Sequence, residues 1–127
     1  MLLTIDPQDR RPIYQQIADG IRTLIAGGQL GEGKLLPPVR QLAADLGVNL
    51  NTIAAAYREL RNDGLIALKH GSGATVASRT AGNHTDDELR RPLRNALTQM
   101  VLAGLRRADI VRMVDDELRG LNTGAKS

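Results

Sequence analysis

The sequence predicts a mainly α-helical fold with one small β-hairpin, and two observations support that prediction. Apolar residues recur at helical spacing in five segments, which are bounded by glycine, proline or capping residues. Between the third and fourth segments, two short β-compatible runs flank a glycine-rich turn. The predicted order is therefore three helices, a hairpin and two further helices. The 127 residues leave room for one compact unit and a small appendage.

The first predicted helix begins at Pro12, a residue suited to a first helical turn, and ends at Gly27. Its apolar face consists of five residues at helical spacing, Ile13, Ile17, Ile21, Leu24 and Ile25. A glycine-rich passage follows, and the pair Pro37 and Pro38 fixes an extended entry into the next helix. We expect this passage to be a loop with short extended stretches.

The second and third predicted helices are short, and about one turn separates them. The second helix has one apolar stripe, Val39, Leu42, Ala43 and Leu46, and stops at Gly47. Asn49 is a suitable N-cap for the third helix, which stops at Gly64 and has the inner face Ile53, Ala56, Tyr57 and Leu60. A short helix, a tight turn and a second helix form the arrangement that presents the second helix to the major groove of DNA.

Polar residues open the third helix, and their chemistry suits DNA. Asparagine can form two hydrogen bonds with adenine, threonine can bond a base or a phosphate, and a helix N-terminus attracts phosphate through its free N–H groups. Asn49, Asn51 and Thr52 also suit simple helix capping, which is the commoner role of an isolated Asn-x-Asn-Thr. The DNA-binding interpretation is favoured because helix, helix, helix and hairpin is the order of a winged helix-turn-helix.

The hairpin is predicted from runs 65–69 and 74–78, which flank a glycine-containing turn. Lys69 and His70 lie at its tip beside Gly71, where the backbone can approach a phosphate or the minor groove. An ordinary solvated turn explains the same residues equally well.

Residues 10–78 resemble the GntR family of regulators. The resemblance is carried by LPPVRQLA at 36–43, LGVN at 46–49, YREL at 57–60, DGLI at 63–66 and GSGATV at 71–76. It implies a winged helix-turn-helix domain over residues 10–78 and a sequence-specific DNA-binding transcription regulator, commonly a repressor. It also implies that six residues face DNA, namely Arg40, Asn49, Asn51, Thr52, His70 and Gly71.

The chain departs from the family pattern at two positions. Many members have arginine where this chain has Leu50, and a basic residue near Ala54, so base readout is expected to differ. Leu50 can instead contact a thymine methyl group. With Lys69 in the wing, the predicted DNA-binding residues are Arg40, Asn49, Leu50, Asn51, Thr52, Lys69, His70 and Gly71.

Residues 79–85 are polar and are expected to form a linker. Thr85 to Glu88 have the spacing of a capping box, and two amphipathic helices follow over residues 86–121, with a disordered tail at 122–127. Two such helices make too small a core to stand alone. Their apolar stripes need a partner, either the N-terminal domain or the same helices of a second copy.

We favour the second copy, because self-complementary burial gives a two-fold dimer. The YtrA-like branch of the family, which has two C-terminal helices of similar length, implies the same role. The predicted dimerisation residues are Leu93, Leu97, Met100, Val101, Ile110, Val114 and Leu118.

Composition and charge limit the classes of protein. The chain has no cysteine, which excludes disulfide scaffolds, thiolate metal sites and cysteine nucleophiles. No apolar run approaches the roughly 20 residues that cross a bilayer, and a signal-peptide pattern is missing, so we expect a soluble cytoplasmic protein. The net charge of +3 permits nucleic-acid binding without demanding it.

An enzymatic role is not expected. Residues 28–34 have the glycine and lysine spacing of a phosphate-binding loop, but they follow a helix, and Leu35 stands where serine or threonine should hold magnesium. His84 beside acidic residues 86–88 suggests a metal site, yet those carboxylates are better explained by a helix N-terminus. The sequence therefore predicts no catalytic residue, metal or cofactor. It leaves open a small-molecule effector, and also a winged helix that binds only protein.

Overall fold

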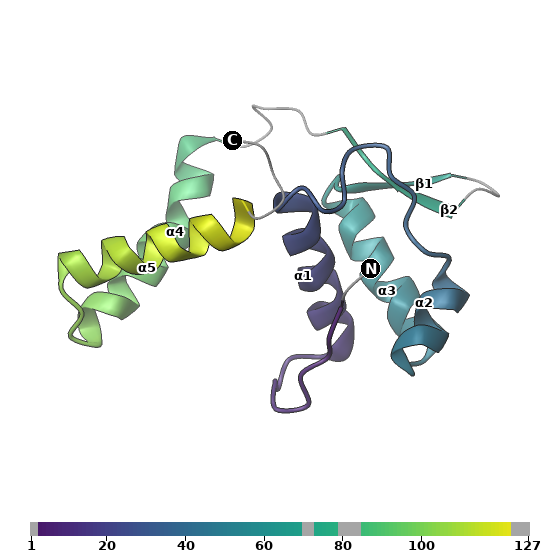
Figure 1. The fold of residues 1–127 in the computed structure, drawn as a ribbon, viewed down its shortest axis with the longest axis horizontal. Helices are drawn as coiled ribbons and strands as arrows, with labels where there is room; N and C mark the ends of the chain where they lie inside the picture. The colour runs from purple at the N-terminus through teal and green to yellow at the C-terminus, as the bar shows by residue number, and fades with distance from the viewer. Residues whose placement is uncertain (1–2, 70–72, 79–84, 123–127) are drawn as a thin grey trace.

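The computed structural model describes residues 3–69, 73–78 and 85–122, which form five helices and one two-stranded antiparallel sheet. In chain order the elements are α1 (Ile13–Ala26), α2 (Val39–Leu46), α3 (Leu50–Asn62), β1 (Ile66–Lys69), β2 (Gly73–Val76), α4 (Asp86–Leu102) and α5 (Arg107–Asn122). This order confirms the predicted fold class. Figure 1 shows α1, α2, α3 and the hairpin as one unit, with α4 and α5 beyond α1, where the two helices cross in this view.

One hydrophobic core joins the first three helices to the hairpin. Its largest fully buried side chains are Ile17, Ile21, Leu36, Ile53 and Leu60. Burial of an aliphatic side chain of this size contributes roughly 1.5–3 kcal/mol. The inner face predicted for α3 is confirmed, since Ile53, Ala56, Tyr57 and Leu60 are all buried. The apolar face predicted for α1 includes one residue that is not buried. Ile13, in the first turn of the helix, is 43% exposed.

The turn between α2 and α3 is fixed by two local features. Gly47 has φ 68° and ψ 34°, the left-handed conformation that favours glycine, and its N–H bonds to the carbonyl groups of Ala43 and Ala44. The Asn49 side chain then accepts a 2.8 Å hydrogen bond from the backbone N–H of Asn51. Both the glycine stop and the asparagine cap were predictable, and both are confirmed.

The hairpin packs its inner face on the helices. Ile66 pairs with Val76 and Leu68 with Ala74, and Ile66, Ala74 and Val76 are buried in the core. Residues 33–36 run beside β2, with backbone bonds between Leu36 and Ala74 and between Val76 and residue 34. The expected extended stretch before α2 therefore lies along the free edge of β2 and is joined to it by backbone hydrogen bonds. Residues 70–72 lie outside the described part of the chain.

The α4–α5 hairpin differs from the rest of the chain because it has no core of its own. Thr85 caps α4 by accepting a 3.1 Å hydrogen bond from the Glu88 N–H, as the capping-box spacing predicts. None of the side chains of α4 is buried. The tail expected at 122–127 lies outside the described residues, except for Asn122, which ends α5. None of the helices in the described ranges is long and apolar enough to span a membrane.

Candidate nucleic-acid interface

The N-terminal end of α3 presents the predicted base-reading side chains to solvent. Asn49, Leu50 and Asn51 are exposed, Leu50 by 41%, and Thr52 is half-buried. Asn49 uses its carbonyl oxygen as the helix cap and keeps its NH2 group as a donor. Capping and DNA contact are therefore compatible at this residue. The first turn of α3 contains no acidic residue, so its positive dipole end is available to phosphate.

Arg40 lies at the N-terminal end of the short helix α2, whereas the turn to α3 follows the C-terminal end of α2. It is the second residue of that helix, it is exposed, and the described residues offer it no ion-pair partner. About two helical turns separate it from the cap of α3. An exposed guanidinium without a carboxylate partner in the described ranges has the chemistry of a phosphate ligand.

Arg58 belongs to the same face of α3 and was missed by the sequence reasoning. Asn51, Ala55 and Arg58 are spaced by four and three residues, so they share one helix face, opposite the buried Ile53 and Leu60. Arg58 is exposed and forms no ion pair within the described ranges. The helical period that located the inner face would also have located this residue. We add Arg58 to the candidate interface.

The wing is only partly described. Lys69 pairs with Gly73 through the backbone at the last position of the β1–β2 register. The predicted contacts His70 and Gly71 lie outside the described residues. Within the register, the pair Lys69 and Gly73 lies at the end of the sheet remote from the pair Ile66 and Val76.

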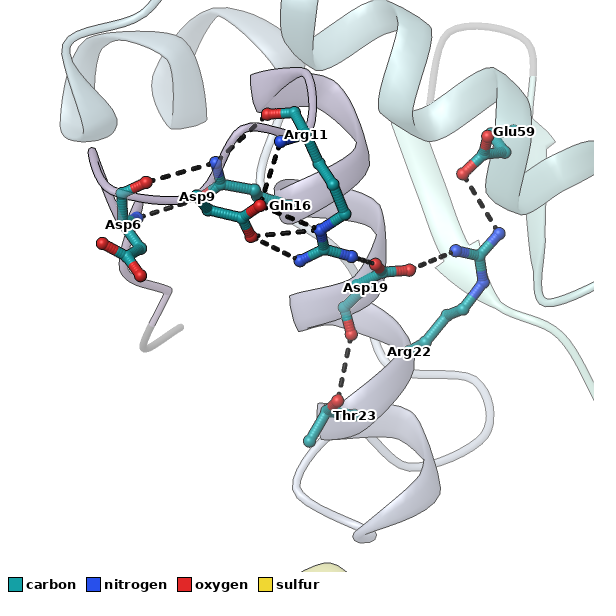
Figure 2. A network of polar contacts seen from close by, with 8 residues as sticks. All are labelled: Asp6, Asp9, Arg11, Gln16, Asp19, Arg22, Thr23 and Glu59. Carbon is teal, nitrogen blue, oxygen red and sulfur yellow. Dashed lines mark hydrogen bonds and ion pairs between the residues drawn. The ribbon is translucent and has the colours of Figure 1, made fainter. Parts of the chain in front are cut away.

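Three acidic side chains of this unit gather around Arg22. Figure 2 shows Arg22 of α1 bonded to Asp19, 2.7 Å away, and to Glu59 of α3, 3.1 Å away. Asp63, at the C-terminal end of α3, bonds to the same guanidinium. Burial lowers the pKa of Arg22, but hydrogen bonds to the three carboxylates outweigh it and raise the pKa above its ordinary value. Charge is therefore segregated along α3, with carboxylates at its C-terminal end only.

The same network ties the N-terminal segment to α1. Arg11 bonds to Asp9 at 2.8 Å and also to Asp19, while the buried Gln16 side chain accepts a 2.9 Å hydrogen bond from the Asp6 N–H (Figure 2). Arg11 and Arg22 are thus engaged by carboxylates, which sets them apart from Arg40 and Arg58.

Two enzyme-like signals of the sequence concerned a metal site and a phosphate-binding loop. The described residues include no group of three or more His, Asp or Glu side chains that could hold a metal ion. The segment 28–34 follows α1, and the Gly33 N–H bonds to the Val76 carbonyl instead of facing a free cavity. The interpretation of this segment as an ordinary loop is consistent with that geometry.

An apolar groove of about 640 Å3 lies between α4 and α5. Its lining includes six of the seven predicted dimerisation residues, namely Leu93, Leu97, Val101, Ile110, Val114 and Leu118. Met100 is half-buried outside the lining, whereas Val111, which the sequence reasoning missed, is part of it. Arg107 and Asp115 are the charged residues of the groove.

Comparisons with known proteins agree with this geometry. The family model for bacterial regulatory proteins, gntR family, matches residues 13–76, just over half of the chain. The HTH-type transcriptional repressor YtrA of Bacillus subtilis is 37% identical over 76 residues, covering 60% of this chain and 58% of YtrA. The chain thus matches less than two thirds of that relative.

Two solved structures are similar. A transcriptional antiterminator from Listeria monocytogenes has a TM-score of 0.86 at 28% identity and covers 96% of this chain and 93% of its own. AraR(DBD), solved in complex with operator ORX1, has a TM-score of 0.53 at 28% identity and covers 59% of this chain and 93% of its own. The matched family consists of regulatory proteins, in agreement with the prediction that the chain is not an enzyme. The chain therefore belongs to the GntR family of bacterial transcription regulators, and its similarity to YtrA confirms the predicted likeness to the YtrA-like branch.

Proposed function

We propose that this chain is a sequence-specific repressor that binds a two-fold symmetric operator as a homodimer in the cytoplasm. The observation that carries the proposal is the exposed start of α3, where Asn49, Leu50 and Asn51 stand beside a dipole end without carboxylates. The name of YtrA includes the word repressor, and AraR(DBD) was solved with an operator, which supports the same assignment.

Each predicted residue has a distinct role in this proposal. Arg40 and Arg58 bind phosphates and position the domain, and Asn51 pairs with adenine. Leu50 contacts a thymine methyl group, while Asn49 and Thr52 bond the backbone or a base edge. The remaining contacts, made by the wing, are assigned to Lys69, His70 and Gly71.

Pairing through α4 and α5 is supported by the exposure of their apolar side chains. Large hydrophobic residues on both helices are exposed, with Leu102 reaching 82%. An isolated pair of helices below about 40 residues cannot stabilise itself, so a second surface must cover the groove. A second copy supplies a matching surface, and two-fold pairing allows Arg107 of one copy to face Asp115 of the other.

Such a dimer places two copies of α3 in successive major grooves. The half-sites then lie about 10 base pairs apart, or a multiple of that separation. Occupancy of a promoter by the dimer would block RNA polymerase, which is how we infer repression.

DNA binding is tested by fluorescence anisotropy with a duplex from the chain's own promoter and a scrambled duplex, each at several salt concentrations. We expect tighter binding to the promoter duplex and a loss of affinity with salt. Arg40→Ala and Arg58→Ala should each weaken binding, whereas Arg91→Ala on α4 should not. Equal affinity for the two duplexes would eliminate the specific regulator and favour the protein-binding adaptor.

Dimerisation is tested by light scattering on two full-length variants. Leu97→Asp introduces a charge into the groove and should yield a monomer. Gln99→Asp introduces the same charge on an exposed position of the same helix and should remain a dimer. A wild-type monomer, or a Leu97→Asp dimer, would contradict pairing through this groove.

A further inference from the structure

Gly27 occupies an unusual position at the end of α1. It is buried, and a Cβ atom added to it would lie 2.7 Å from the backbone carbonyl oxygen of Leu121 in α5. The same atom would also collide with Oε1 of Gln29, which is the end of a flexible side chain. Since φ is −80°, an ordinary helical value, the backbone conformation of this residue does not require glycine. The close approach of α5 requires it instead.

This approach joins the two parts of the molecule. Among the described elements of the DNA-binding unit, α1 is the one against which α5 chiefly packs, and α1 in turn packs against α3. Figure 1 shows the C-terminal end of α5 beside the C-terminal end of α1. The orientation of the pairing groove relative to α3 therefore depends on how closely α5 approaches Gly27.

We infer that Gly27 is a positioning residue that sets the angle between the α4–α5 hairpin and the DNA-binding unit, and through it the half-site spacing that the dimer accepts. The inference rests on the proposed homodimer. A buried glycine that is not among the predicted DNA-binding residues would thus influence which operators the dimer binds.

The size of the effect follows from the distances. Ordinary van der Waals contact begins near 3.4 Å, so a methyl group at Gly27 moves the Leu121 carbonyl away by about 0.7 Å. For a helix about 10 Å wide and about 24 Å long, this shift is a tilt of about 4° that moves the far end by about 1.7 Å. In a two-fold dimer the displacement doubles to about one base-pair step of 3.4 Å.

The test uses an operator that the wild-type chain selects from random duplexes. Its two half-sites are then separated by inserting or deleting one base pair at a time, and affinity is measured for every spacing and for a single half-site. We expect the wild type to prefer one spacing by at least about tenfold, the cost of one step off register. Gly27→Ala should bind the single half-site within twofold of the wild type, with its optimum moved by a base pair or its preference flattened below threefold.

Matched controls separate this effect from a general change of stability. Gly31→Ala and Gly120→Ala add the same methyl group where no atom lies within 4 Å, and both should keep the wild-type spacing profile. The double variant Gly27→Ala with Gln29→Ala removes the side-chain obstacle and keeps the clash with the Leu121 carbonyl. It should behave like Gly27→Ala alone. A wild-type spacing profile in both Gly27 variants would overturn the inference.

A distance measurement tests the position of the α4–α5 hairpin directly, and circular dichroism first establishes that each labelled variant keeps the helical content of the wild type. Because the chain has no cysteine, spin labels can be attached at Arg61→Cys on α3 and Asn95→Cys on α4, in mixed dimers with excess unlabelled chain. We expect one narrow distance distribution in the wild type and in Gly31→Ala, and a shifted or broadened one in Gly27→Ala. A broad wild-type distribution would overturn the inference. Failure of the proposed function is distinguishable, because the wild type would then be monomeric or would bind no duplex specifically.

Discussion

The Tyr57 hydroxyl donates a 2.6 Å hydrogen bond to the backbone carbonyl of Pro37 and so joins α3 to the segment that leads into α2. The tyrosine ring is buried, while its partner is one of the two prolines that fix the entry into α2. The bond therefore holds the start of α2 against α3. At the other end the same helices are held by Gly47 and the Asn49 cap.

Tyr57→Phe is expected to lower the free energy of unfolding by about 1 kcal/mol, because the Pro37 carbonyl loses its partner while ring packing is kept. Urea denaturation followed by circular dichroism measures the loss. Tyr14→Phe is the matched control, since Tyr14 is half-buried and its hydroxyl has no hydrogen bond within the described ranges. Equal effects of the two substitutions would show that the bond to Pro37 contributes nothing.

Stability should fall at alkaline pH through the same residue. Burial raises the pKa of Tyr57 to about 12 from its ordinary 10.0. The neutral phenol is thus favoured in the folded state, so its contribution is complete below pH 10 and is lost as the pH rises from about 10 towards 12. The unfolding free energy of the wild type minus that of Tyr57→Phe should shrink over this interval. A constant difference between pH 8 and pH 12 would contradict the raised pKa.

Arg22 is expected to stabilise the packing of α1 on α3. Arg22→Ala leaves Asp19, Glu59 and Asp63 without their shared cation, so we expect a loss of about 1 kcal/mol at low salt that diminishes in 1 M NaCl. The control is Arg91→Ala, which removes a single exposed helical pair with Asp87. If the two variants lose equal stability at both salt concentrations, the three-carboxylate network has no special role.

Local signals in the sequence located most of the fold. The left-handed glycine at 47 and the cap at 49 depend on neighbouring residues, so the turn between α2 and α3 could be predicted. The packing of Leu3 onto Gly20 could not, because contacts between distant segments leave no periodic pattern. Gly27 illustrates the same limit: the sequence identifies it as a helix stop, whereas its burial under α5 gives it a second reason to be glycine.

The residues of the candidate site at the capped start of α3 could be predicted from the sequence. The residues further along its exposed face were predicted incompletely. Asn49 and Asn51 were found from the start of α3, but Arg58 lies two turns further along and was found only once the exposed face of the helix was known. Similarly, the period of α5 indicated Ile110 and Val114, while Val111 was found only from the lining of the groove.

The predicted contact of Leu50 tests base recognition directly. It can be removed either by changing the protein at Leu50 or by removing the thymine methyl group from the DNA. If its exposed side chain meets a thymine methyl group, replacing that thymine by deoxyuridine should weaken wild-type binding by about 1 kcal/mol, roughly fivefold. Leu50→Ala should weaken binding to the normal operator similarly, and the uracil duplex should then bind the variant no worse. Fluorescence anisotropy is measured for both proteins with both duplexes, which gives a double-mutant cycle. If the losses of binding free energy from the two changes simply add, the methyl group contacts another residue of α3. Asn62→Ala, at the far end of the helix, should leave the thymine preference unchanged.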